Sequence, residues 1–168
     1  PFSHSRHITE IFAKLFFPLV EKSFNVDFTL PKKDLISSAE FLPLTKTLLG
    51  NHSETNKIVC VNINAGKLCH LRRWPQESYV ELVLGLYNRF GAKTVLVGGK
   101  EDVSYVDDFI MKLPKEISLF NFCGKLSIKE LIGLFNRSRL LITNDSGPLH
   151  IASIVGLPTI SFFGPETP

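Results

Sequence analysis

The residues best suited to chemistry form one polar turn near the end of the chain, Asn-Asp-Ser-Gly-Pro-Leu-His at residues 144–150. The apolar run 140–143 precedes the turn and is typical of a strand buried on both faces. Ser146 suits the N-cap of a following helix, and Gly147 would let a ligand approach the backbone closely. A helix that begins at the carboxyl end of a parallel strand offers its N–H groups to phosphate. The turn therefore predicts a binding site for a nucleotide-like anion.

The backbone donors of this turn follow from its sequence. Pro148 has no N–H and cannot donate. The donors expected here are therefore the backbone N–H groups of Ser146, Gly147 and Leu149. His150 would lie one turn into the helix, near the same turn. A lone histidine is more often structural, but its place beside this turn favours a functional role.

The elements that would position this turn alternate regularly from residue 58 onward. Apolar runs ended by Gly or polar residues predict strands at 58–63, 94–98, 117–123, 140–143 and 159–163. Helical spacing of apolar residues, with start and stop signals, predicts helices at 75–90, 104–113, 127–135 and 146–155. This order predicts an α/β fold, Rossmann-like, with a mostly parallel sheet and helices on both faces.

Residues 1–57 do not follow this alternation, and we interpret them as a segment that connects to an N-terminal domain missing from the chain. Residues 8–20 predict a packed helix, with a contact to a membrane surface as the alternative. Residues 58–168 are expected to form one domain, truncated at its C-terminus.

Composition excludes several classes of protein. A chain of 168 residues with 44% hydrophobic residues has ample material for one core. The net charge of +3 comes without a dense basic stripe, so nucleic acid is not an expected partner. We see no signal peptide and no run of the ~20 apolar residues that span a membrane. Cys60, Cys69 and Cys123 lack metal-ligand spacing; Cys60 and Cys123 are expected to be buried thiols, which suits the cytoplasm.

Three further loops follow predicted strands. The first contains the turn Asn64-Ala65-Gly66 and then two arginines before a helix start, Arg72 and Arg73. Turn amides and a guanidinium at a helix N-terminus could both reach a diphosphate. The alternative is a solvated loop with two surface arginines.

The second loop begins with Gly98-Gly99, and its Glu101 or Asp102 could accept hydrogen bonds from ribose hydroxyls. The alternative is that these acids only complement the helix dipole. In the third loop, residues 124–127, the backbone could face a base or ribose, or could simply cap a helix. The sequence has no G-x-S-x-G elbow, Walker A, HExxH or GxGxxG motif, which argues against a simple dehydrogenase.

Taken together, the loops resemble glycosyltransferase family 9, the ADP-heptose:lipopolysaccharide heptosyltransferase family. The resemblance runs in order from about residue 58 to the end and fits loosely over residues 1–57. It is carried by Asn64-Ala65-Gly66, by Arg72-Arg73-Trp74-Pro75, and by residues 97–99, 124–127, 144–152, 158–159 and 163–165.

This resemblance implies one half of a GT-B fold, the C-terminal domain that binds a nucleotide-sugar donor. It implies an inverting glycosyltransferase of bacterial lipopolysaccharide biosynthesis that uses neither metal nor cofactor. The donor would be ADP-heptose foremost, and the acceptor a lipopolysaccharide core or similar glycan. The catalytic base would be an acidic residue of the missing N-terminal domain, so this chain alone would be inactive. The enzyme would be cytoplasmic, with peripheral contact to the inner membrane possible.

The resemblance also implies roles for individual residues. Arg72 would hold a donor phosphate, and Glu101 would contact the ribose. The remaining donor-binding residues would be Asn64, Ala65, Gly66, Asp145, Ser146, Gly147 and His150. Other classes stay open: a non-catalytic module for nucleotides or sugar phosphates, a nucleotide-sugar 2-epimerase of the GT-B type, or an α/β domain that only binds other proteins.

Overall fold

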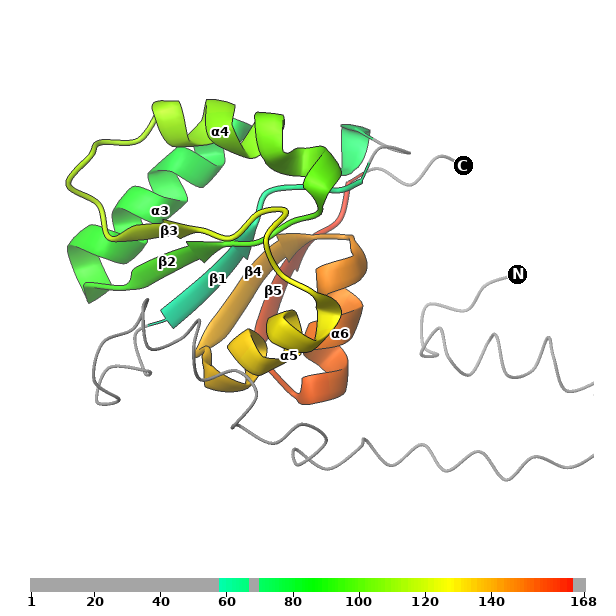
Figure 1. The fold of residues 1–168 in the computed structure, drawn as a ribbon. Helices are drawn as coiled ribbons and strands as arrows, with labels where there is room; N and C mark the ends of the chain where they lie inside the picture. Colours follow the sequence, from blue (N-terminus) through cyan, green and yellow to red (C-terminus); the bar gives the residue numbers. More distant parts are fainter. Residues whose placement is uncertain (1–57, 67–69, 165–168) are drawn as a thin grey trace, which may run out of the picture.

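The computed structural model describes residues 58–66 and 70–164, and the expectations for residues 1–57, Cys69 and 165–168 lie outside these ranges (Figure 1). The strands are β1 (Ile58–Asn62), β2 (Lys93–Leu96), β3 (Leu119–Asn121), β4 (Leu140–Asn144) and β5 (Thr159–Phe162). The helices are α3 (Gln76–Phe90), α4 (Val103–Met111), α5 (Ile128–Arg137) and α6 (Gly147–Val155). Short 3-10 turns precede α3 and α4, at η3 (His70–Arg72) and η4 (Lys100–Asp102).

The strands form one five-stranded parallel sheet in the order β3-β2-β1-β4-β5. The chain moves outward from β1 to β3 and then crosses back to β4, so β1 has β2 on one side and β4 on the other. In the register, Val59 pairs with Thr94 of β2 and with Leu140 of β4. In open α/β sheets, ligands bind beyond the carboxyl ends of the strands where the order reverses, which here is between β1 and β4.

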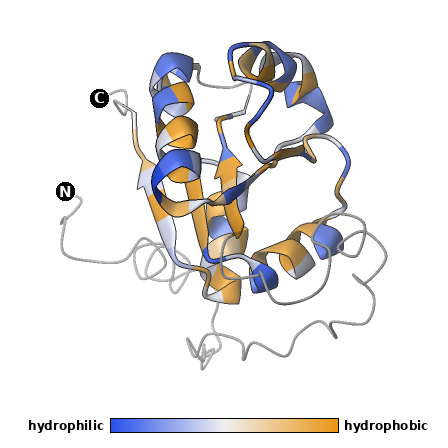
Figure 2. Ribbon diagram, turned by 90° about the vertical axis from the view of Figure 1, so that its left-hand side faces the viewer, coloured by the Kyte–Doolittle hydropathy of each residue, from blue (hydrophilic) through white to orange (hydrophobic). Residues whose placement is uncertain are grey.

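Helices cover both faces of the sheet, as predicted. In Figure 1, α3 and α4 lie on one side and α5 and α6 on the other. Tyr79 and Phe109 are fully buried on the first side, and Leu134 and Phe135 are buried on the second. Figure 2 shows the apolar strands between the helices. Strands enclosed on both faces explain the continuous apolar runs in the sequence.

Local start and stop signals act as the sequence predicts. Ser127 and Glu130 form a capping box at the start of α5, with Glu130 N donating to Ser127 Oγ at 3.3 Å and Ser127 N donating to Glu130 Oε2 at 2.7 Å. Gly156 ends α6 with φ of 71°, a left-handed conformation that glycine adopts at little cost.

Some boundaries differ from prediction. The third strand is shorter than 117–123, because Ile117 N bonds to Pro114 O in a turn and the Asn121 side chain accepts from Cys123 N. Pro75 lies at the N-cap of α3 and not at its first helical position. None of the helices in the described ranges is long and apolar enough to cross a membrane.

Candidate functional site

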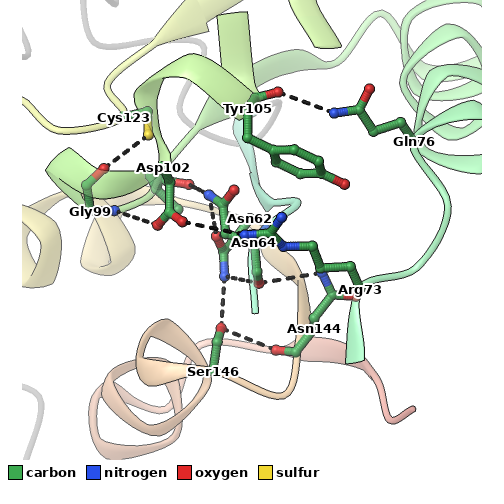
Figure 3. Close-up of polar contacts among 11 residues, drawn as sticks. Asn62, Asn64, Arg73, Gln76, Gly99, Asp102, Tyr105, Cys123, Asn144 and Ser146 are labelled. Atoms are coloured by element: carbon green, nitrogen blue, oxygen red, sulfur yellow. Dashed lines mark hydrogen bonds and ion pairs between the residues drawn. The ribbon is translucent and has the colours of Figure 1, made fainter. Parts of the chain in front are cut away.

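The carboxyl ends of β1 and β4 are joined by the side chain of Asn62, the last residue of β1 (Figure 3). Its Nδ2 donates to Thr143 Oγ1 at 3.0 Å and to Ser146 Oγ at 2.7 Å. The residue is buried, at 1% exposure, so these bonds are shielded from water. Sequence analysis missed this role, although an asparagine at the end of an apolar strand was the available signal.

Asn64 and Asn144 are also buried, and together with Asn62 they form what we call the asparagine floor of the site. Asn64 Nδ2 donates to Asn62 Oδ1 at 3.1 Å and to Val97 O at 3.4 Å, which ties the loop after β1 to β2. Asn144 Nδ2 donates to Asn64 O at 3.3 Å, while its Oδ1 accepts from Trp74 N at 3.0 Å. The loops after β1 and β4 are therefore held together by buried amide groups.

In the predicted turn Asn64-Ala65-Gly66, the first residue belongs to the asparagine floor and the other two lie nearer the surface. Asn64 is 2% exposed, and its Oδ1 has no hydrogen-bond partner among the described residues. Ala65 and Gly66 stay partly exposed, with Gly66 at φ of 71°. A ligand at this turn would thus meet the backbone of Ala65 and Gly66 before it meets the Asn64 side chain.

The N-terminus of α6 is open. Ser146 occupies the N-cap as predicted, but its hydroxyl donates to Asn144 O at 3.2 Å and does not cap a helix N–H. Leu149 N, one of the predicted donors, is already bonded to Ser146 O at 3.0 Å. The N–H groups of Ser146 and Gly147 have no acceptor among the described residues. A Cβ at Gly147 would meet no atom of the described residues within 4 Å, so these residues leave space beside the first residue of α6.

Arg72 and Asp145 meet beside this helix start. Arg72 Nη1 lies 3.0 Å from Asp145 Oδ2, and the two side chains are 40% and 21% exposed. Arg72 ends η3, and Asp145 lies between β4 and α6. Two residues that the sequence placed at one site, from loops far apart in the chain, are thus brought together.

Arg73 differs from its neighbour. Its side chain is only 16% exposed; its guanidinium lies 4.2 Å from the centre of the Tyr105 ring, and Nη2 lies 3.9 Å from Asp102 Oδ1 (Figure 3). The alternative that both arginines lie on the surface is therefore wrong for Arg73. Asp102 is buried and accepts from Gly99 N at 3.1 Å, which removes it as the alternative to Glu101 for a ribose contact.

The remaining candidates lie along the same edge. Glu101 is exposed, and its carboxylate is so near Gly99 that a Cβ there would approach it to 2.6 Å. His150 is exposed on α6. Cys123, two residues after β3, donates to Gly99 O at 3.3 Å. Burial raises the pKa of the Cys123 thiol to about 11, so the group stays protonated and non-nucleophilic near neutrality.

Trp74 anchors the loop that carries both arginines. Its ring stacks on Phe162 of β5 with centroids 4.3 Å apart and meets Tyr79 edge-on at 5.0 Å. Sequence analysis named Trp74 only as part of the motif that carries the resemblance. The edge of the sheet therefore offers an open helix N-terminus, a partly exposed guanidinium and an exposed carboxylate, which suit an anion that also carries hydroxyl groups.

Comparisons with known proteins show which family the chain resembles in sequence. A model of glycosyltransferase family 9 (heptosyltransferase) matches residues 3–168. The lipooligosaccharide heptosyltransferase 2 of Haemophilus influenzae is 33% identical over 99 residues, which cover 58% of this chain and 28% of that protein.

Solved structures share the fold. The Escherichia coli ADP-heptose LPS heptosyltransferase II superposes with a TM-score of 0.68 and 25% identity, over 79% of this chain and 40% of that one. A family 9 glycosyl transferase from Veillonella parvula gives a TM-score of 0.61 and 30% identity, over 77% and 35% of the two chains. These matches confirm the expected Rossmann-like half of a GT-B fold. The chain spans less than half the length of either structure.

Proposed function

The chain belongs to glycosyltransferase family 9, and from this we propose that it forms the nucleotide-sugar-binding half of a glycosyltransferase. The observation that carries the proposal is the open N-terminus of α6 with Arg72 beside it, paired to Asp145 at 3.0 Å. Backbone donors, a helix dipole and a guanidinium converge there, as the binding of a diphosphate requires.

In the proposed complex, the N–H groups of Ser146 and Gly147 donate to the diphosphate, and Arg72 exchanges its bond to Asp145 for a phosphate oxygen. Glu101 accepts from the ribose hydroxyls. The turn Asn64-Ala65-Gly66 and His150 line the rest of the donor site. During transfer, Arg72 and the helix dipole stabilise the negative charge that develops on the leaving nucleoside diphosphate.

The donor that we propose is ADP-heptose, because the similar E. coli structure is that of an ADP-heptose LPS heptosyltransferase. The acceptor is a lipopolysaccharide core or related glycan, by analogy with the relatives that act on lipopolysaccharide or lipooligosaccharide. An acceptor hydroxyl would attack the anomeric carbon with inversion and without a metal. Its base would come from an N-terminal domain joined through residues 1–57, on the cytoplasmic face of the inner membrane.

Titration of the chain with ADP, UDP, GDP and ADP-heptose tests the proposal. Trp74 is the one tryptophan in the sequence and follows the two arginines, so its fluorescence reports binding at this edge, with calorimetry as an independent measure. We expect saturable binding of ADP and ADP-heptose, and no sugar transfer by this chain alone.

Matched variants locate the site. Arg72→Ala removes a charge-assisted bond and should weaken ADP binding by about tenfold, equivalent to ~1.4 kcal/mol. Gly147→Val places side-chain atoms in the free approach to α6, whereas Gly85→Ala adds a methyl group in equally open space on α3. Binding lost in Gly147→Val and retained in Gly85→Ala supports the site. If no nucleotide binds, or if neither Arg72→Ala nor Gly147→Val weakens binding, the proposal is wrong.

A further inference from the structure

A largely buried ion pair joins the loops that follow β1 and β2. Arg73 Nη2 lies 3.9 Å from Asp102 Oδ1, and the side chains are 16% and 7% exposed. The second oxygen of Asp102 accepts from Gly99 N at 3.1 Å, and the Arg73 guanidinium lies 4.2 Å from the Tyr105 ring centre. The loop after β2 thus holds Asp102 in place, and α4 holds Arg73 in place.

Each member of this pair is the chain neighbour of a proposed donor contact. Arg73 follows Arg72, whose guanidinium reaches toward Asp145 and the start of α6. Asp102 follows Glu101, which is exposed beside Gly99. The side chains of Arg73 and Asp102 point toward each other, whereas Arg72 pairs with Asp145 and Glu101 is exposed.

The pair is a poor device for stability alone. Taking two charges out of water costs about as much as their attraction returns, and apolar replacements are often as stable. The distance of 3.9 Å is long for a charge-assisted hydrogen bond, and Arg73 Nε has no partner among the described residues. Such an arrangement fixes the relative position of the two loops and contributes little to the stability of the fold.

We propose that the Arg73–Asp102 pair is a spacer that fixes the separation between Arg72 and Glu101. Resting on the proposed function, this makes Arg73 and Asp102 positioning residues for a nucleoside diphosphate. Arg72 binds the phosphates and Glu101 binds the ribose, and both contacts form together only when the two loops keep their spacing. The pair therefore raises the affinity for the intact nucleoside diphosphate, but not the affinity for the nucleoside or for pyrophosphate alone.

The test compares a joined ligand with its fragments. Affinities for ADP, adenosine and pyrophosphate are measured for the chain and for Asp102→Asn and Arg73→Lys. Linking two fragments on a rigid site gains affinity that is lost when the geometry loosens. We expect the affinity for ADP to fall by about tenfold, while those for adenosine and pyrophosphate change by less than about twofold. A purely structural role would weaken all three ligands alike.

A double-mutant comparison makes the test sharper. If the pair acts through Arg72, Asp102→Asn should have no further effect on ADP affinity in an Arg72→Ala background. Should the single variants fail to fold, the paired replacement Arg73→Met with Asp102→Leu supplies an apolar contact, and the same loss for ADP alone is expected.

Three results would overturn the inference: unchanged ADP affinity in folded variants, equal losses for ADP and pyrophosphate, or effects that add to that of Arg72→Ala. These leave the proposed function intact, because the unaltered chain still binds ADP. Absence of ADP binding by the unaltered chain would instead overturn both proposals.

Discussion

Asp145 holds Arg72 through a carboxylate oxygen 3.0 Å from the guanidinium, next to Ser146 and Gly147, whose N–H groups have no acceptor among the described residues. A carboxylate and a phosphate offer an arginine similar acceptor oxygens. The Arg72 guanidinium that would bind a phosphate is therefore already paired with Asp145. A phosphate that binds here has to compete with the Asp145 carboxylate for Arg72.

Asp145→Asn should for this reason tighten the binding of ADP. The pair is 40% and 21% exposed, so solvent screens it. Pairs of this kind are worth about 0.2–1 kcal/mol, equivalent to a gain in affinity of at most about fivefold. The measurement is calorimetric titration with ADP at low and at high salt, with the gain expected to shrink as salt rises. A tenfold loss of affinity would show instead that Asp145 itself supports the phosphate.

The packing of Gly98 against the asparagine floor leads to a prediction about stability. A Cβ on Gly98 would lie 2.5 Å from Asn64 Nδ2 and 2.8 Å from Cys123 Sγ. Asn64 cannot move aside without breaking its bonds to Asn62 and Val97. Gly98→Ala should therefore lower the free energy of unfolding by about 1–3 kcal/mol, as overpacking does.

Gly85 is the matched control for this substitution. A Cβ there would meet no atom of the described residues within 4 Å, and the residue lies inside α3. Gly85→Ala should raise the free energy of unfolding by about 0.5–1 kcal/mol. Urea denaturation of the two variants checks both signs, and a neutral Gly98→Ala would contradict the close contact.

The order of strands and helices was predictable because a sheet buried on both faces needs apolar strands and helices with one apolar face. Both patterns can be read directly from the sequence. The turn at 144–150 was predictable because Ser146 and Gly147 have local meanings at a helix start. The roles of Asn62 and Arg73 were not. They depend on Thr143 and Asp102, which reach them only after β4 and β2 pair with β1, and no local spacing encodes that contact.

The two described cysteines should be unreactive in the folded chain. Burial raises the pKa of Cys60 to about 12 and that of Cys123 to about 11. Since thiolates are the reactive form, both should label slowly at about pH 8. In a Cys69→Ser background, a disulfide reagent should react with them far faster in urea than in buffer. Rapid labelling of the folded chain would contradict their burial.

The same shift of Cys60 gives stability a dependence on pH. A thiol that titrates near 9.0 when unfolded and at about 12 when folded leaves stability unaffected below the lower value. As pH rises through this interval, the unfolded chain releases a proton that the folded chain retains, so the free energy of unfolding falls. Cys60→Ala should remove this part of the decline, as measured by urea denaturation across the alkaline range.

The capping box at α5 gives the opposite dependence at acidic pH. Hydrogen bonds from the hydroxyl and the backbone N–H of Ser127, both 2.7 Å long, lower the pKa of Glu130. The unfolded value is 4.5, so the stabilisation is complete above it and is lost as pH falls through the lower folded value. Ser127→Ala should cost about 1 kcal/mol near neutrality.

Glu130→Gln isolates the contribution that titrates. Its unfolding temperature should lie below that of the unaltered chain at about pH 7, and the two should converge as the pH falls through the folded pKa of Glu130, which is lower than 4.5. Glu81→Gln, which removes an exposed carboxylate from α3, is the control for a change in net charge. A gap that stays constant or widens on acidification would show that the bonds from Ser127 do not favour the ionised form of Glu130.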